Sequence, residues 1–185
     1  MTPENRQELK WIQESKRDPE AFEPLFNKYH HPIFNYILRR TCREALAKDL
    51  TASTFMKALD HIHQFQWKGI PFSAWLYRIA TNEINQYFRK HRRTVTLTDE
   101  HIRSMQSDSH TDDALMEAEA NLEKQKKSRK VYQALIQLKM KYQDVLTLRY
   151  YEDLSVKETA EILRIPENTV KTHIRRGLQQ LKKLL

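Results

Sequence analysis

Hydrophobic side chains recur every three or four residues through most of the N-terminal half, which is the period of an amphipathic helix. The first run covers residues 22–38 and follows Asp18 and Pro19, a capping residue with proline at the first helical position. Pro24 and Pro32 lie inside this run, and a proline removes a backbone donor and clashes with the preceding turn. The pattern therefore predicts a helix that is bent or split in two.

Two more amphipathic runs follow, over residues 45–63 and 72–91. The inward positions of the first are Leu46, Leu50, Phe55, Leu59 and Ile62. Those of the second are Phe72, Trp75, Leu76, Ile79, Ala80, Ile84 and Phe88. A loop over residues 64–71 separates the two helices, and the second ends in cations, which the helix dipole favours at a C-terminus.

Apolar residues become sparse between residues 94 and 121, where Ser, Thr, Asp and Glu dominate. This composition predicts a flexible linker over residues 94–123, with a root-mean-square reach of about 30 Å. Beyond it the periodicity returns and predicts helices over residues 124–139 and 141–151. The chain is thus expected to contain two small helical domains, residues 1–93 and 124–185.

The most specific local pattern in the chain is a helix-turn-helix after residue 151. Ser155 and Glu158 have the spacing of a capping box, which opens a helix running to Leu163. Residues 164–166 (Arg-Ile-Pro) break this helix. We expect Asn168 or Thr169 to cap the next one.

The second helix of this motif has two chemically different faces. At 100° per residue one side forms an apolar stripe, made of Val170, Ile174, Leu178, Leu181 and Leu185. The opposite side and its edge carry Lys171, Thr172, Arg175, Arg176, Gln179 and Lys182. These side chains suit base edges and phosphates in the DNA major groove, and the amides near Asn168 and Thr169 can hold a phosphate. The alternative is an amphipathic helix with a solvated basic face.

Composition supports an all-α protein. The chain has two glycines, too few for a turn-rich β architecture, a Walker loop or a Rossmann fingerprint. Its single cysteine, Cys42, excludes a disulfide scaffold and fits the cytosol. The polar N-terminus does not resemble a signal peptide, and no apolar run is long enough to span a membrane. We therefore expect a cytoplasmic protein.

The net charge of +8 is unevenly distributed along the chain. Residues 1–93 carry +6, residues 94–123 carry −7, and residues 124–185 carry +9. Two basic blocks on either side of an acidic segment suggest two polyanion-binding modules on a tether. Ordinary solvated surface charge is the alternative explanation.

Taken together, these segments resemble sigma factors of the extracytoplasmic-function (ECF) type. Residues 146–185 (LTLRYYEDLSVKETAEILRIPENTVKTHIRRGLQQLKKLL) look like region 4, the −35-reading domain. Residues 45–59 (ALAKDLTASTFMKAL) and 71–93 (PFSAWLYRIATNEINQYFRKHRR) look like region 2, which binds core RNA polymerase and the −10 element. The resemblance covers nearly the whole chain outside the linker.

The resemblance implies a role for each matching position. Core polymerase binding, on the clamp of the largest subunit, falls on Asp49, Leu50, Ser53 and Phe55. Recognition of the −10 element falls on Phe65, Lys68, Arg78, Asn82, Arg89, Lys90, Arg92 and Arg93, with Asn82 near an extruded base. Tyr77 is expected to face outward beside Arg78, whereas Trp75 is expected in the core. Recognition of the −35 element falls on Asn168, Thr169, Lys171, Thr172, Arg175 and Arg176.

Several positions depart from the family pattern. Ala52 and Ser53 replace a frequent Gln-Glu pair, and Lys48 replaces Glu, so part of the core-binding surface differs. Gln86 stands where Asp is common, and Lys139 where Pro is common. Asn168 replaces a usual Gly, a mild change because Asn tolerates left-handed backbone conformations.

The family also implies partners. These are the clamp and flap regions of core RNA polymerase, promoter DNA, and an anti-sigma factor that is often membrane-bound; the acidic linker would thread into the basic product channel of the polymerase. No cofactor and no small-molecule substrate are implied. Three alternatives remain: a stand-alone helix-turn-helix regulator, an adaptor sharing the fold, and an enzyme. The last lacks support because the histidines at 30, 31, 61 and 63 and Cys42 do not have metal-site or catalytic spacing.

Overall fold

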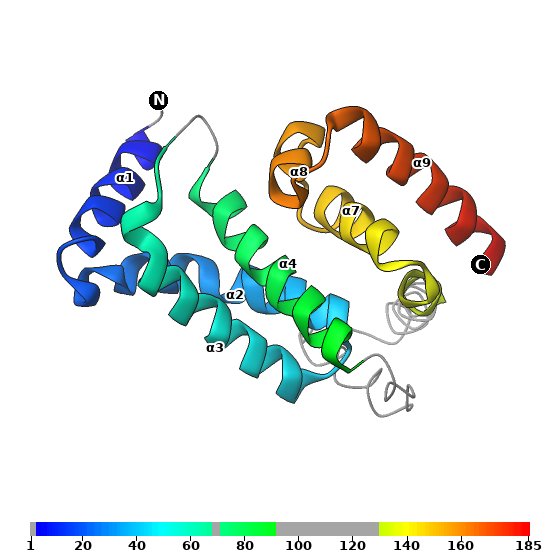
Figure 1. Ribbon diagram of the computed structural model, residues 1–185, viewed down its shortest axis with the longest axis horizontal. Coiled ribbons are helices and arrows are strands. Elements are labelled where there is room, and N and C mark those ends of the chain that lie inside the picture. The colour runs from blue at the N-terminus through cyan, green and yellow to red at the C-terminus, as the bar shows by residue number, and fades with distance from the viewer. Residues whose placement is uncertain (1–2, 68–70, 92–129) are drawn as a thin grey trace, which may run out of the picture. The chain divides into compact units, whose positions relative to one another are not determined.

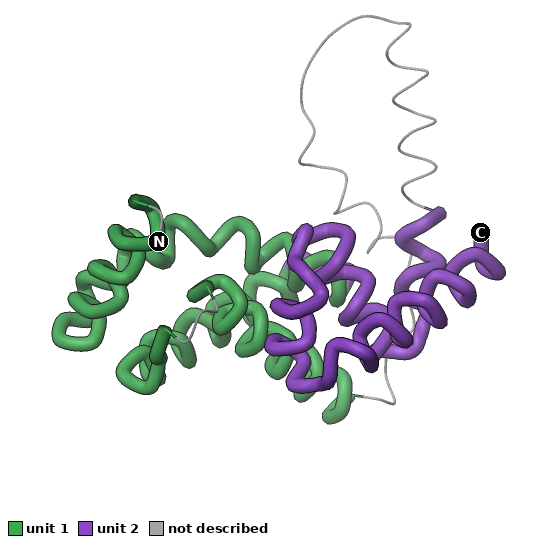
Figure 2. Tube along the Cα trace, turned by 90° about the horizontal axis from the view of Figure 1, so that it is seen from above, with its two compact units in different colours: residues 1–41, 45–95 green, residues 42–44, 96–185 purple. Residues whose placement is uncertain are grey.

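A computed structural model describes residues 3–67, 71–91 and 130–185, and every regular element in these ranges is a helix (Figure 1). The predicted all-α fold is therefore confirmed. The chain divides into two compact units, a first unit of residues 1–41 and 45–95 and a second unit of residues 42–44 and 96–185 (Figure 2). The predicted linker over residues 94–123 lies outside the described residues, as does the start of the helix predicted over 124–139.

Helix α1 (Pro3–Ser15) was not predicted from the hydrophobic pattern. It buries Ile12, but it also buries Glu8, whose side chain occupies a position where the helical period calls for an apolar residue. Lys28 Nζ and the Tyr29 hydroxyl both lie on α2 (Glu23–Thr41) and donate to Glu8 Oε2, the hydroxyl at 2.6 Å. Burial and this hydrogen bond raise the pKa of Tyr29, so its hydroxyl remains a donor.

The sequence predicted a helix that is bent or split at the prolines, and the split is wrong. Asp18 caps a short 3-10 helix, η1 (Pro19–Phe22), and its side chain accepts a backbone N–H two residues ahead, as the sequence indicated. Helix α2 (Glu23–Thr41) then runs without interruption through Pro32. Pro24 lies in its first turn, where the missing N–H has no intrahelical acceptor to lose. Burial of the residues that follow Pro32 compensates for the one backbone bond lost there.

Three elements complete the described part of the first unit: α3 (Glu44–His61), η2 (Ile62–Gln64) and α4 (Phe72–Lys90). The core is mainly apolar and draws on all of them and on α2; its members include Ile33, Tyr36, Ile37, Leu50, Phe55, Ile62, Phe72, Leu76, Ala80 and Ile84. A hydrogen bond of 2.8 Å between the hydroxyls of Tyr36 and Thr81 links α2 to α4 inside it. Five predicted core residues are only half-buried: Leu46, Leu59, Trp75, Ile79 and Phe88.

The second unit contains a helical stretch over residues 130–137, followed by α7 (Met140–Tyr150), α8 (Val156–Leu163) and α9 (Glu167–Leu184). Its core joins all four, with Leu135, Leu138, Tyr142, Val145, Leu146, Ala160 and Val170 buried and Ile174 and Leu181 packed against them. Lys139 precedes α7 with φ −62°, a value that proline also adopts, so its departure from the family pattern leaves the helix start unchanged.

The apolar stripe predicted on α9 is partly wrong. Val170 is fully buried, but Leu178 and Leu185 are 40% and 61% exposed. The buried position in this part of the helix is Gly177, which the amphipathic pattern did not mark as core. A Cβ at this glycine would lie 3.1 Å from Leu146 Cδ1 and 3.3 Å from Tyr142 Cβ. The glycine therefore permits α7 and α9 to cross more closely than a side chain would allow.

We expect Gly177→Val to lower the free energy of unfolding of the second unit by about 1–3 kcal/mol, because the added methyl groups overpack the crossing. Thermal unfolding of the full chain, followed by circular dichroism, measures this effect. Gln180→Val, at an exposed position of the same helix, places the same β-branched residue away from the core and is the control. Equal unfolding temperatures for the two variants would contradict the close crossing.

Candidate nucleic-acid interface

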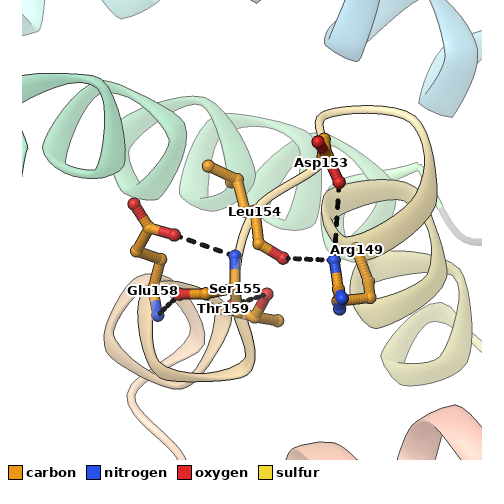
Figure 3. Close-up of polar contacts among 6 residues, drawn as sticks. All are labelled: Arg149, Asp153, Leu154, Ser155, Glu158 and Thr159. Atoms are coloured by element: carbon orange, nitrogen blue, oxygen red, sulfur yellow. Dashed lines mark hydrogen bonds and ion pairs between the residues drawn. The ribbon is translucent and has the colours of Figure 1, made fainter.

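The first helix of the helix-turn-helix begins with the predicted capping box (Figure 3). Ser155 Oγ accepts the backbone N–H of Glu158 at 3.1 Å, and Glu158 Oε2 accepts the backbone N–H of Ser155 at 2.8 Å. Thr159 adds a hydrogen bond of 2.8 Å from its hydroxyl to the Ser155 carbonyl. The two reciprocal bonds of Ser155 and Glu158 satisfy backbone donors that the start of a helix otherwise leaves unpaired, so α8 has a defined start.

A second set of contacts holds the turn that leads into α8 (Figure 3). Arg149, in the last turn of α7, donates from Nη1 to the Leu154 carbonyl at 3.0 Å. The same nitrogen lies 3.7 Å from Asp153 Oδ1. Asp153 has a positive φ of 48°, which a non-glycine residue adopts at a cost. Arg149 thus stabilises the strained turn between α7 and α8, and with it the orientation of α8 relative to α7.

The turn between α8 and α9 lies where the sequence predicted it, but the N-cap of α9 lies at a different residue from the one predicted. Arg164 ends α8 in the left-handed region, with φ 54° and ψ 45°. Helix α9 begins at Glu167, and its N-cap is Pro166, whose carbonyl accepts the N–H groups of Thr169 at 2.9 Å and Val170 at 3.1 Å. The predicted cap at Asn168 or Thr169 is wrong because Pro166 already has the extended backbone that an N-cap requires.

The solvent side of α9 carries the polar and cationic residues that the sequence predicted there. Lys171, Arg175 and Arg176 are exposed, and no residue of this helix beyond Glu167 is acidic. Thr172 is half-buried, and its hydroxyl donates to the Asn168 carbonyl at 2.8 Å, which leaves its oxygen free to accept. Such a surface, with guanidinium groups on the exposed side of a helix, can donate to guanine edges and to phosphates.

His173 is a residue of this helix that the sequence interpretation did not select. Its ring lies edge-on to Tyr142, with 5.6 Å between the ring centroids, and its Nδ1 is buried without a hydrogen-bond partner among the described residues. Burial lowers the pKa of His173 below its ordinary value of 6.5, and the nearby charges of Lys141 and Arg176 lower it further. The side chain is therefore neutral near pH 7.

The candidate −10 residues of the first unit differ in how far they are exposed to solvent. Asn82, Arg89 and Lys90 are exposed on α4, and Arg78 is half-buried. Phe65 is only 6% exposed, with its ring centroid 5.2 Å from that of Phe72 and 5.4 Å from that of Trp75, a half-buried neighbour. Lys68, Arg92 and Arg93 lie outside the described residues.

The expected outward orientation of Tyr77 is wrong. Its side chain is 6% exposed and packs edge-on against Tyr36, with 5.3 Å between the ring centroids. Residues 76 and 77 are consecutive and both buried, because α4 packs within the first unit over a wider arc than the apolar stripe alone would cover. A tyrosine hydroxyl also lets this residue stay in a core that contains other polar groups.

The candidate polymerase-binding residues on α3 also divide by exposure. Asp49 is exposed, whereas Leu50 and Phe55 are 9% and 5% exposed and belong to the core. Ser53 is half-buried and donates to Glu83 Oε2 on α4 at 2.7 Å, while Lys57 donates to the other oxygen of the same carboxylate. The open side of α3 includes Ala52 and Met56, the latter 68% exposed.

His173 makes the stability of the second unit depend on pH. As the pH falls from 7.5 through 6.5, the unfolded chain binds the proton before the folded one, so the free energy of unfolding decreases. We expect His173→Gln to show a smaller decrease over the same interval. Hydrogen exchange of the slowest amides of α7, corrected for intrinsic exchange rates, measures this difference. Parallel pH profiles for the two proteins would show that His173 does not titrate abnormally.

Comparison with known proteins matches both units to one family. The model for sigma-70 region 2 matches residues 25–94, and the model for sigma-70 region 4 matches residues 128–181. Two solved structures share the fold: CnrH, in complex with the cytosolic domain of CnrY, and the sigma factor RpoE of Bartonella quintana, in complex with the anti-sigma factor NepR. CnrH has 20% identity, a TM-score of 0.66 and coverage of 94% of either chain. RpoE has 19% identity, a TM-score of 0.65 and coverage of 89% of this chain and 96% of RpoE.

Curated relatives extend the match over nearly the whole sequence. The ECF RNA polymerase sigma factor SigW of Bacillus subtilis is 35% identical over 178 residues, covering 94% of this chain and 93% of SigW. SigM of the same organism is 30% identical, covering 89% of this chain and 94% of SigM. BldN of Streptomyces coelicolor is 31% identical over 169 residues. The match covers 91% of this chain but only 61% of BldN. The chain belongs to the ECF family of RNA polymerase sigma factors.

Proposed function

We propose that this chain binds core RNA polymerase and directs it to promoters by recognising a −35 and a −10 element. The observation that carries the proposal is α9, the second helix of the helix-turn-helix, which presents Lys171, Arg175 and Arg176 to solvent. Helix α8, which packs against it, has a side-chain cap and a preceding turn held by Arg149. The first unit matches sigma-70 region 2, which a DNA-binding domain alone would not need. The activity is non-catalytic and requires no cofactor.

In the proposed complex α9 enters the major groove at the −35 element. Arg175 and Arg176 have the donor geometry to contact guanine edges, and Lys171 is suited to a phosphate. Thr172 can accept from a base through its free lone pairs. Asn168 and Thr169 lie in the first turn of the helix, so their part is to approach a phosphate with their side-chain donors and the backbone N–H of Asn168.

The first unit would hold the −10 element near Asn82. The exposed amide offers both donors and acceptors to an extruded base, and Arg78, Arg89 and Lys90 lie on the same helix to contact the backbone. Phe65 is assigned a supporting role, because its buried ring anchors the segment before α4 against Phe72. Lys68, Arg92 and Arg93 remain proposed phosphate contacts.

Docking on the polymerase would use the open side of α3. Asp49 and the exposed Met56 lie two helical turns apart on this side, with Ala52 between them. Leu50 and Phe55 would act from beneath by fixing α3 in the core. Ser53 is held by Glu83, so its contribution is to keep α3 and α4 aligned.

An anti-sigma factor is a further proposed partner. Its support is the shared fold with RpoE, which was solved in complex with the anti-sigma factor NepR. No described helix of this chain is long and apolar enough to cross a membrane. We place the protein in the cytoplasm, where any membrane attachment would come through such a partner.

Runoff transcription with purified core polymerase, on genomic fragments that include the chain's own promoter, tests the proposal. We expect specific transcripts only when the protein is added, because promoter recognition needs both units held by the core enzyme. A stand-alone regulator would give a different result. It would bind specific DNA tightly by itself, would not co-elute with core polymerase, and would produce no new transcripts.

Arg176→Ala should weaken the complex of polymerase and promoter by about 1–3 kcal/mol at one −35 base pair, because a direct base contact is lost. Binding of the holoenzyme to a set of promoters that vary singly across the −35 element measures this. Gln180→Ala, exposed one turn after Arg176 on the same helix and uncharged, is the control. An equal loss on every sequence would identify Arg176 as a phosphate contact instead.

A further inference from the structure

Lys141 is an exposed cation that lies outside the helix-turn-helix, in the first turn of α7. Its Nζ is 5.2 Å from the centroid of the neighbouring Tyr142 ring. A cation at this distance from an aromatic face is attracted to it, so the ammonium is held near Tyr142. The lysine is thus placed by a specific contact.

Tyr142 also determines which part of α9 the lysine adjoins. Its ring lies edge-on to the His173 ring, with 5.6 Å between the ring centroids. Its Cβ lies 3.3 Å from the position that a Cβ on Gly177 would take. Arg176 follows His173 by three residues, which places the two side chains on one flank of α9. The first turn of α7 therefore lies next to the edge of the proposed DNA-reading face.

Lys141 and Arg176 bring exposed positive charges to this edge, whereas Asp144, on the same helix as Lys141, is buried. The first turn of α7 contains no acidic residue, and no side chain caps it. Lys141 forms no ion pair with a described residue, and Tyr142, which its ammonium contacts, also contacts His173 on the flank of α9 that carries Arg176. Like charges brought together repel one another, so this arrangement becomes favourable when an anion joins it.

We propose that Lys141 binds a backbone phosphate of the −35 DNA, beside the groove that α9 enters, so that α7 forms part of the DNA interface. This inference rests on the proposed function, since it extends the same surface. The contact carries no base information. It fixes how α9 sits in the groove, because phosphate contacts set the register and orientation of a DNA-binding helix.

The test compares Lys141→Gln with Lys10→Gln in reconstituted holoenzyme. Lys10 is an exposed residue of α1, so its substitution removes the same charge from the first unit. We expect Lys141→Gln to weaken promoter binding about 3- to 10-fold at low salt, equally on promoters with different −35 sequences. The slope of log affinity against log salt concentration should fall by about 0.9, the change expected for one phosphate contact. Lys141→Arg should restore both values.

A methylphosphonate scan of the −35 element locates the contact. Wild-type holoenzyme should lose affinity when one particular phosphate is neutralised, and Lys141→Gln should lose nothing further at that position. If Lys141→Gln matches Lys10→Gln in affinity and salt slope, the inference fails while the proposed function stands. If wild-type holoenzyme does not bind the −35 element at all, both fail together.

Discussion

The close crossing of α7 and α9 is the constraint on which the candidate DNA interface depends. With Leu146 and Tyr142 lying against the bare backbone at Gly177, α9 cannot roll without either opening a void or overlapping α7. This fixes which side of α9 faces the core, with Val170 buried, and so which side remains for Arg175 and Arg176. The same contact places the first turn of α7 beside the basic face.

Polar contacts at the turns determine the position of α8, in addition to the packing of α7 against α9. Helix α8 has only 8 residues, too few to be stable alone, so its position depends on its ends. Arg149 holds the turn before it, and the reciprocal bonds of Ser155 and Glu158 define its first turn. A left-handed Arg164 ends it. These short-range features set the angle between the two helices that a DNA groove must accept.

Buried polar groups explain why the sequence interpretation missed α1 and misplaced Tyr77. Glu8 occupies a core position of α1, and its partners Lys28 and Tyr29 lie on another helix, so no local pattern could mark α1. Ser53 could be assigned to a binding surface, but its partner Glu83 lies thirty residues away. Tyr77 was expected to face outward, but it lies in the core against Tyr36 on another helix. The ring of Phe65 is also buried, and its part in −10 recognition remains a prediction.

The sequence alone determined the all-α class, the capping box at Ser155, the break after Leu163 and the cationic side of α9, because each depends on residues within a few positions of one another. Tertiary structure decided the rest. A helical period cannot distinguish Leu178, which is exposed, from Gly177, which is buried, because only the approach of α7 makes the smaller residue the one that fits. Contacts between residues distant in sequence depend on such packing, so a local sequence pattern does not determine them.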